Sequence, residues 1–213
     1  MVEVAKFLFF QLLVRPLVLI VLGLNVRHRE RLPRQGPAIL AANHNSHLDT
    51  MVLMTLFPWR MLRRLRPVAA ADYFLRNRFV AWFSQRILGI LPIDRSGQTP
   101  RGELFDGAAR ALAGGDVVIV FPEGSRGEPE TLQEFKSGLY HLCAANPQVP
   151  LYPIFLHGLG KALPKGEALL VPFFCDVFVG EAMHCSDDRR RFMEQFGERM
   201  RALAAEGSFA PWE

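Results

Sequence analysis

The run LAANHNSHLDT brings two histidines and an aspartate close together, His44, His47 and Asp49. The apolar residues before Asn43 are typical of a strand, and a helix that begins near Ser46 would follow. His44 would then lie in the turn, and the Asp49 carboxylate, about one helical turn later, could reach the imidazole. Such a contact fixes the tautomer of the ring and stabilises the imidazolium that forms when histidine takes a proton. We therefore predict His44 as a general base and Asp49 as the group that orients it.

A second histidine offers an alternative to this assignment. His47 is a rival base, but it follows Ser46, the expected helix cap, and should point away from the turn. A capping loop with a surface histidine is the structural alternative. The chain has no GxSxG sequence that would supply an activated serine. The pair therefore suits a reaction in which the substrate brings its own hydroxyl group and the protein only removes the proton.

A single arginine closes the apolar run GILPIDR. Arg95 stands at the expected end of a strand, where its guanidinium group could hold a phosphate or a carboxylate through two parallel hydrogen bonds. The alternative is an ion pair with Asp94 or another nearby acid.

The run DVVIVFPEGSRG leads a buried-type strand into a glycine-containing turn. Glycine lets the backbone approach a ligand closely, and successive N–H groups can form an anion-binding nest. Gly124, Ser125 and the guanidinium group of Arg126 would therefore face an anion. Glu123 could bind a substrate hydroxyl group or orient the arginines, and orientation is the favoured interpretation. A plain strand–turn–helix connection is the alternative, and the turn lacks the ending of a Walker loop.

The length and the cysteine content set further limits. A chain of 213 residues is long enough for one substantial core in one domain. Cys143, Cys175 and Cys185 are odd in number and lack CxxC spacing, which indicates reduced thiols in a cytosolic setting. A zinc site of Cys175, His184 and Cys185 fits no closed four-ligand pattern. We expect neither a metal nor a cofactor.

Arginines gather in two parts of the chain, whose formal net charge is +4. The first cluster comprises Arg27, Arg29, Arg31 and Arg34, and the second comprises Arg60, Arg63, Arg64 and Arg66. No nucleic-acid-binding motif accompanies them, so we expect no nucleic acid partner. Basic residues beside an apolar segment favour contact with an anionic membrane surface. Solvated helix faces remain the alternative for the second cluster.

The segment KFLFFQLLVRPLVLIVLGL, residues 6–24, is nearly long enough to span a bilayer. An arginine at the centre of a span costs roughly 2.5–3.5 kcal/mol, and proline kinks or breaks a helix. We therefore predict two short apolar helices joined at Arg15–Pro16 that lie in the membrane interface, with the following arginines on the cytosolic side. An ordinary buried helix is the alternative. The predicted division is a membrane-associated segment over residues 1–26 and one domain over 27–213.

Beyond residue 36, short β-rich runs alternate with helical ones. We expect strands at residues 37–42, 66–71, 89–95, 116–121, 151–156 and 167–180, and helices at 48–56, 72–88, 101–115, 131–145 and 187–206. This alternation predicts a single α/β domain with a mixed, largely parallel sheet flanked by helices. Ligands bind such sheets beyond the carboxyl ends of the strands, where the three polar runs should fall.

Four runs of the chain, in this order, resemble the sequence blocks of a known family. NHNSHLD resembles the block NHxSxxD, GILPIDR a second block, FPEGSRG the block FPEG(T/S)R, and VPLYPI a fourth. Together they cover about residues 35–160 of the chain. They are similar to the 1-acylglycerol-3-phosphate acyltransferases, a family of glycerolipid acyltransferases.

The resemblance implies transfer of a fatty acyl chain from acyl-CoA or acyl-carrier protein to the free hydroxyl group of a lysophospholipid, without an acyl-enzyme. His44 would be the base and Asp49 its orienting group. The phosphate of the acceptor would be held by Arg95, Glu123, Gly124, Ser125 and Arg126. Pro153 would shape the pocket, and Arg60, Arg63 and Arg64 could serve an acidic donor. The acyltransferase domain, residues 27–213, would work at the cytoplasmic face of the inner membrane.

Several alternatives stay open within this resemblance. The acceptor could be glycerol-3-phosphate, another lysophospholipid or a lyso-aminolipid instead of 1-acylglycerol-3-phosphate. A non-catalytic lipid-binding membrane protein and a thioesterase are alternatives from other classes. The sequence leaves the acyl-chain length, the choice of donor and the oligomeric state undetermined.

Overall fold

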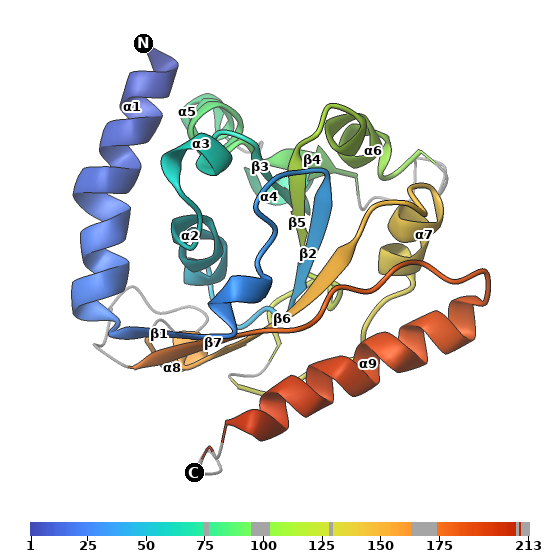
Figure 1. Cartoon of the computed structure of the whole chain (residues 1–213). Helices are drawn as coiled ribbons and strands as arrows, with labels where there is room; N and C mark the ends of the chain where they lie inside the picture. Colours follow the sequence, from blue (N-terminus) through green and yellow to red (C-terminus); the bar gives the residue numbers. More distant parts are fainter. Residues whose placement is uncertain (75–76, 95–102, 128–129, 163–173, 208, 210–213) are drawn as a thin grey trace.

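The computed structural model describes residues 1–74, 77–94, 103–127, 130–162, 174–207 and 209 (Figure 1). Within these residues a seven-stranded sheet has the order β1-β7-β6-β2-β5-β3-β4. The strands are β1 Leu24–Arg27, β2 Ala38–Ala42, β3 Leu65–Ala70, β4 Leu91–Ile93, β5 Val117–Val120, β6 Leu151–His157 and β7 Cys175–Val179. All neighbouring strands are parallel except β6 and β7. The prediction of a single α/β domain with a mixed, largely parallel sheet is confirmed.

Helices cover both faces of this sheet (Figure 1). The side chains of β2 alternate between the faces: Leu40 packs in one core with the N-terminal helix, while Ile39 packs in the other with α6, α7 and α9. The helices after the N-terminal one are η3 Arg29–Arg31, α2 Leu48–Thr55, α3 Trp59–Leu62, α4 Ala71–Phe74, α5 Arg78–Phe83, η4 Ser84–Leu88, α6 Asp106–Ala113, α7 Gly138–Ala144, α8 Leu159–Ala162 and α9 Arg189–Glu206. Both faces of the central strands are therefore buried, which explains their continuous apolar sequences.

The N-terminal helix buries one stripe of side chains against the sheet domain. It comprises α1 Val2–Leu8 and two π-helical stretches, η1 Phe9–Val14 and η2 Leu17–Val21. The stripe is Lys6, Phe10, Val14, Val18 and Leu22, each at most 3% exposed. These residues are four positions apart, whereas an α-helix has 3.6 residues per turn. The π turns hold more residues per turn, so they keep the stripe on one side of the helix.

Helical backbone continues through Arg15 and Pro16, both of which have right-handed helical dihedral angles. The prediction of two helices joined at these residues is therefore wrong. Pro16 lies between the two π-helical stretches, where the wider turns accommodate the missing N–H group. The guanidinium group of Arg15 donates to the Phe57 carbonyl at 2.9 Å and to Gln11 Oε1 at 3.3 Å. None of the helices in the described part of the chain has the length and apolarity needed to cross a bilayer.

The first strand was not expected from the sequence. β1 pairs in parallel with β7, so the predicted boundary between residues 26 and 27 falls inside this strand. Four residues at the end of a long apolar segment carry too short a pattern to be distinguished from the helix before them. The N-terminal helix and the sheet thus share one core.

The predicted helix over residues 131–145 forms only in its second half, as α7. Two backbone contacts hold the first half against the turn after β5. Gln133 N–H donates to Glu123 Oε1 at 3.4 Å, and Lys136 N–H donates to the Pro122 carbonyl at 2.9 Å. Of the strand region expected at 167–180, β7 is observed, while residues 163–173 lie outside the described residues.

Candidate active site

Two of the three predicted polar runs, those after β2 and β5, meet at one edge of the sheet, while Arg95 of the third lies outside the described residues. β2 lies between β5 and β6, parallel to both, with Ala41 opposite Val120 and Ala42 opposite Ile154. The residues that follow β2 and those that follow β5 therefore emerge side by side. This edge, at the carboxyl ends of the parallel strands, is where ligands bind in sheets of this type.

His44 and Asp49 are in direct contact. Nδ1 of the imidazole lies 2.8 Å from Oδ2 of the carboxylate. The same oxygen accepts from the N–H groups of Asn45 at 2.7 Å and Ser46 at 2.9 Å. Asp49 is completely buried in the first turn of α2. Its carboxylate therefore holds both the turn and the ring, as a local contact within one loop.

With Nδ1 bonded to Asp49, the Nε2 atom of His44 remains as the nitrogen that can act on a substrate. When Nδ1–H donates to the Asp49 carboxylate, the neutral imidazole carries its lone pair on Nε2 and can accept a proton there. The His44 side chain remains 19% exposed, and its ring stacks on Phe121 with a centroid distance of 4.2 Å. Burial raises the pKa of Asp49, and hydrogen bonds from His44, Ser46 and Asn45 act in the opposite direction.

His47 occupies a different environment. It is the residue directly before α2, and it is exposed. Its pKa is lowered, first by partial desolvation and then by the charges of Arg126 and His44. Ser46 Oγ accepts from the Leu48 N–H at 3.4 Å. The prediction of Ser46 as the helix cap is nevertheless wrong, because α2 begins at Leu48 and its N-cap residue is His47, which forms no side-chain capping hydrogen bond.

Glu123 lies beneath the turn that carries His44. Its side chain is buried, Oε2 accepts from the His44 N–H at 3.2 Å, and Oε1 accepts from the Gln133 N–H at 3.4 Å. Burial raises the pKa of Glu123 to about 7, although both hydrogen bonds lower it. Within the described residues neither oxygen bonds to an arginine. Glu123 thus anchors the histidine turn, whereas sequence reasoning favoured orientation of the arginines.

The rest of the FPEGSRG turn folds over His44. Gly124 has a φ of +78°, which favours glycine, and its N–H donates to the Phe121 carbonyl at 2.9 Å. Gly127 N–H donates to the His44 carbonyl at 3.4 Å, so Arg126 is held beside the histidine turn. Arg126 is half-buried and forms no ion pair within the described residues. Ser125 is exposed, and Arg95 lies outside the described residues.

Four contributors to the site were missed by sequence reasoning: Phe121, Lys136, Asn45 and Glu130. The Lys136 side chain lies over Gly124, where an added Cβ would stand 2.8 Å from its Nζ. Asn45 Nδ2 donates to the Leu156 carbonyl at 3.0 Å and to Glu130 Oε2 at 3.5 Å, which ties the histidine turn to β6. Only Phe121 and Asn45 lie within the quoted runs, and nothing in those runs indicates their contacts.

Asn43 reinforces the same connection. Its amide donates to the Leu156 carbonyl at 2.9 Å and accepts from the Leu156 N–H at 2.7 Å. Pro153 is buried within β6, opposite Ala41. The histidine turn is therefore fastened to β6 through two asparagines and to the β5 turn through Glu123.

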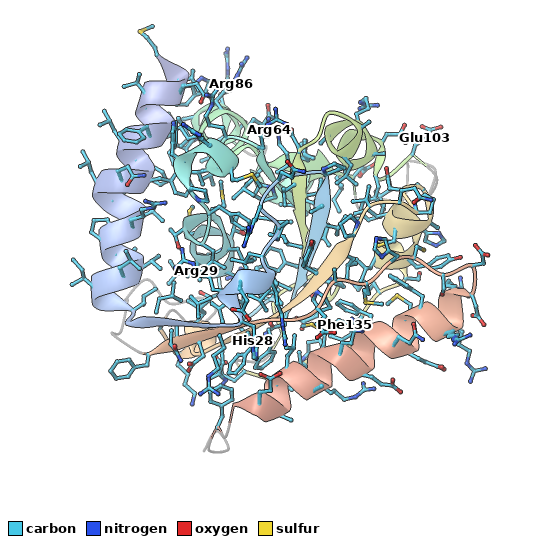
Figure 2. All side chains as sticks on the ribbon, viewed as in Figure 1. His28, Arg29, Arg64, Arg86, Glu103 and Phe135 are labelled. Carbon is cyan, nitrogen blue, oxygen red and sulfur yellow. The ribbon has the colours of Figure 1, made fainter. Side chains whose placement is uncertain are left out.

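The second arginine cluster lies away from this edge. Arg64 directly precedes β3, and Arg66 lies in its first half. β3 is parallel to β5, so these arginines lie at the amino end of the sheet, opposite the candidate site. Arg66 pairs with Asp116 at 2.7 Å, and Arg63 pairs with Glu3 at 2.9 Å. Arg64 donates to the Gly115 carbonyl at 3.3 Å, and Figure 2 shows it at the same end of the sheet. Direct contact of this cluster with a donor bound at His44 is not supported by this arrangement.

Within the described residues, the cysteines and other potential metal ligands do not form a second functional site. Burial raises the pKa of Cys143 and that of Cys175, the latter to about 12. Cys185 is partly buried, and no disulfide joins the three within the described residues. No group of three or more His, Cys, Asp or Glu side chains in this part of the chain could hold a metal ion.

Comparison with known proteins identifies the family. The model of the family described as Acyltransferase matches residues 23–157. The chain belongs to the acyltransferase family. The resemblance of the four sequence blocks is thereby confirmed at the level of the family. The matched region contains the turn after β2, the turn after β5 and all of β6.

Individual relatives agree with this assignment. The chain is 30% identical over 155 residues to the 1-acyl-sn-glycerol-3-phosphate acyltransferase alpha of Homo sapiens, covering 72% of this chain and 52% of that protein. It is 29% identical over 136 residues to the lyso-ornithine lipid O-acyltransferase of Rhizobium meliloti (strain 1021), covering 62% of this chain and 42% of that protein. The chain spans about half the length of the curated relatives it matches.

A solved structure shares the fold. The crystal structure of the 1-acyl-sn-glycerophosphate acyltransferase of Thermotoga maritima superposes with a TM-score of 0.73, covering 98% of this chain and 88% of that chain. The sequence identity is 18%, so this likeness concerns the fold.

Proposed function

We propose that this protein is an O-acyltransferase that moves a fatty acyl chain from a thioester donor to the free hydroxyl group of a lysophospholipid. The acceptor is 1-acylglycerol-3-phosphate, and the product is phosphatidic acid. The observation that carries the proposal is the His44–Asp49 contact, which leaves Nε2 of a partly exposed imidazole available beside the Arg126 turn. Family membership supports the reaction class.

The reaction needs one base and correct placement of two substrates. His44 Nε2 removes the proton from the acceptor hydroxyl group as its oxygen attacks the carbonyl carbon of the thioester. The tetrahedral intermediate collapses, the C–S bond breaks, and the imidazolium returns the proton to the leaving thiolate. Thioesters are already activated, so positioning and one base suffice. Asp49 stabilises the imidazolium that exists between the two proton transfers.

The acceptor phosphate is assigned to Arg126 and the backbone N–H of Ser125, with Arg95 as a further member of the set. Gly124 supplies the shape of the turn, because its own N–H donates to the Phe121 carbonyl. Arg126 is positioned by the Gly127–His44 hydrogen bond, so a phosphate bound to it lies near the base. Charge-assisted hydrogen bonds of this kind contribute roughly 1.5–3 kcal/mol each. Glu123 contributes indirectly, since it holds the turn from below.

A second acceptor class has specific support. One relative is named a lyso-ornithine lipid O-acyltransferase, a name that specifies an acceptor built on an amino acid. The carboxylate of an aminolipid would also satisfy a guanidinium group. A lyso-aminolipid is therefore the second candidate acceptor.

The donor and the location complete the proposal. Acyl-CoA and acyl-carrier protein both present the required thioester. The exposed apolar side chains of the N-terminal helix support a position on the membrane, where both lipid tails stay in the bilayer. The proposed side is the cytoplasmic face of the inner membrane, because arginines follow the apolar segment. Withdrawing an acyl chain from that environment would cost about 0.8 kcal/mol per CH₂ group.

The test is a thiol-release assay on vesicles with a panel of acceptors. We expect thiol release from acyl-CoA or acyl-carrier protein only when an acceptor is present, with lysophosphatidate faster than a lyso-aminolipid. Release without any acceptor would identify a thioesterase. Absence of release with every acceptor, from a preparation that binds lipid, would identify a non-catalytic lipid-binding protein.

A further inference from the structure

Apolar surface is concentrated on one part of this molecule. Within the described residues, every exposed large hydrophobic side chain lies on the N-terminal helix, on α5 or immediately before β7. These side chains are Met1, Val4, Phe7, Leu8, Leu12, Leu13, Leu19, Ile20, Phe79, Val80, Trp82 and Phe174. Scattered single residues would need no explanation, but a collection confined to three segments marks an interaction surface.

We propose that α5 and Phe174 join the N-terminal helix in one surface that binds an anionic lipid bilayer. This inference rests on the membrane location proposed above and extends it to two further segments of the chain. Neither segment belongs to the apolar N-terminus that the sequence associates with a membrane.

The first of these segments presents aromatic side chains to solvent. Phe79 is 69% exposed, Trp82 is 47% exposed and Val80 is 39% exposed. Asn77 caps the helix, with its side-chain oxygen accepting from the Phe79 N–H at 2.8 Å. These rings therefore sit on an ordered first turn. Tryptophan and phenylalanine on one face of a short helix are typical of segments that lie in a membrane interface.

α5 packs against the N-terminal helix. Phe83 packs edge to face on Phe9 with a centroid distance of 5.1 Å, and Phe79 lies 6.5 Å from Phe83. Figure 1 shows α5 beside the first half of the N-terminal helix. The exposed rings of α5 therefore extend the apolar face of that helix sideways.

Phe174 extends the same surface at the other end of the helix. Its side chain is 80% exposed, and its ring lies against Gly23, where an added Cβ would stand 2.7 Å from the ring. Leu24 is opposite Cys175, and His157 is opposite Asp176. The end of the N-terminal helix and Phe174 thus lie at the edge of the sheet that carries His44. A bilayer on this surface would reach the candidate active site.

Positive charge at the margin of the surface determines the kind of partner. Arg78 and Arg86 are exposed at the two ends of the α5–η4 helix, and Arg60 is exposed in α3. Figure 2 shows Arg86 near the first part of the N-terminal helix. Phe7 packs on Trp59, which connects α3 to the same face. Arginines around an apolar aromatic face favour anionic lipid headgroups over a second, equally basic copy of this chain.

The experiment measures vesicle binding by the full-length protein. Sedimentation with phosphatidylglycerol–phosphatidylcholine vesicles is compared for the wild type, Phe79→Ser/Trp82→Ser and Phe174→Ser. Removal of two rings from the interface should weaken partitioning roughly 10-fold or more, and removal of Phe174 should weaken it several-fold. Arg190→Ser, an exposed change on α9, is the matched control and should bind as the wild type does.

A second readout reports the position of α5 directly. Brominated acyl chains should quench the fluorescence of Trp82. Tryptophan emission should therefore decrease more in the wild type than in Trp82→Phe when brominated vesicles are added. Unchanged vesicle binding by the double variant together with unquenched Trp82 would overturn the proposal. Self-association of the wild type through this surface, abolished in the double variant, would also overturn it. Thiol release in detergent with soluble substrates tests the proposed function separately, because it requires no vesicle.

Discussion

Two imidazole–carboxylate pairs lie at the same edge of the sheet, His44–Asp49 beyond β2 and His157–Glu130 at the end of β6. The ring-to-carboxylate distances are nearly equal, 2.8 Å and 2.9 Å. Both carboxylates are buried, and both imidazoles stack on a phenylalanine ring. The pairs therefore have the same chemical elements in the same arrangement.

The surroundings of the two pairs differ. The Glu130 carboxylate, like that of Asp49, accepts from backbone N–H groups, those of Gly158 at 2.8 Å and Gly160 at 2.9 Å. The difference lies in how far the two rings are covered. The face of His157 is covered by Phe209 at a centroid distance of 3.5 Å, and its side chain is 10% exposed against 19% for His44. Glu130 thus fastens a loop, and its histidine is covered by the C-terminal segment.

The comparison indicates that an imidazole–carboxylate pair also needs solvent access before it can act on a substrate. His44 has an available nitrogen, partial exposure and a cation held next to its turn. His157 lacks the exposure, because Phe209 covers the face of its ring. We therefore assign chemistry to the first pair and local stability to the second.

Exchanging the two acids for amides should separate these roles most strongly. Asp49→Asn keeps the shape of the side chain, but the amide can donate to Nδ1 and favour the wrong tautomer, so kcat should fall roughly 10²–10⁴-fold. Glu130→Gln should leave kcat near the wild-type value. It should lower the free energy of unfolding by about 1–3 kcal/mol, because the amide keeps only one of the two oxygens that accept from the Gly158 and Gly160 N–H groups. Steady-state kinetics and denaturant unfolding give both numbers, and equal kinetic losses in the two variants would erase the distinction.

Removing the cation should affect binding more than chemistry. Arg126→Ala should raise the KM for lysophosphatidate about 10- to 100-fold, since one or more charge-assisted bonds to phosphate are lost. Arg126→Lys keeps the charge, so its KM for lysophosphatidate should lie between those of the wild type and Arg126→Ala. A lyso-aminolipid assayed in parallel is the control for phosphate specificity. An unchanged KM for lysophosphatidate would place the phosphate elsewhere.

Glu123 gives the His44 turn a dependence on pH that the His157 pair need not share. Its pKa of about 7 in the fold exceeds the ordinary 4.5, so the unfolded chain releases this proton first as the pH rises. The folded state then binds more protons, and stability should fall between about pH 4.5 and pH 7 by about 3 kcal/mol. In Glu123→Gln this fall should be absent. Denaturant unfolding at pH 5 and pH 8 measures it, and the same fall in the variant would contradict the assignment.

The sequence predicted what is local and periodic. The strands of the central sheet are continuous apolar runs, and Asp49 reaches His44 within one loop, so neither requires knowledge of the fold. The contacts of Glu123 and Glu130 with the His44 turn join residues about eighty positions apart along the chain. Such contacts depend on β2, β5 and β6 being neighbours, and that order follows from packing of the whole sheet.

The N-terminal helix shows a different limit. Pro16 in an apolar segment indicates a break by local rules, but π turns and a buried stripe keep the helix continuous. Tertiary packing overrode the local preference here. The first half of the predicted helix at 131–145 does not form for a related reason, because hydrogen bonds to Glu123 and Pro122 hold this segment in a non-helical path.

The most direct measurement compares His44→Ala with His157→Ala in the thiol-release assay, with lysophosphatidate binding measured by calorimetry. His44→Ala should reduce acceptor-dependent release at least 10²-fold while acceptor binding is retained. His157→Ala should keep its kcat and unfold at lower denaturant concentration. Near-normal turnover by His44→Ala would contradict the account.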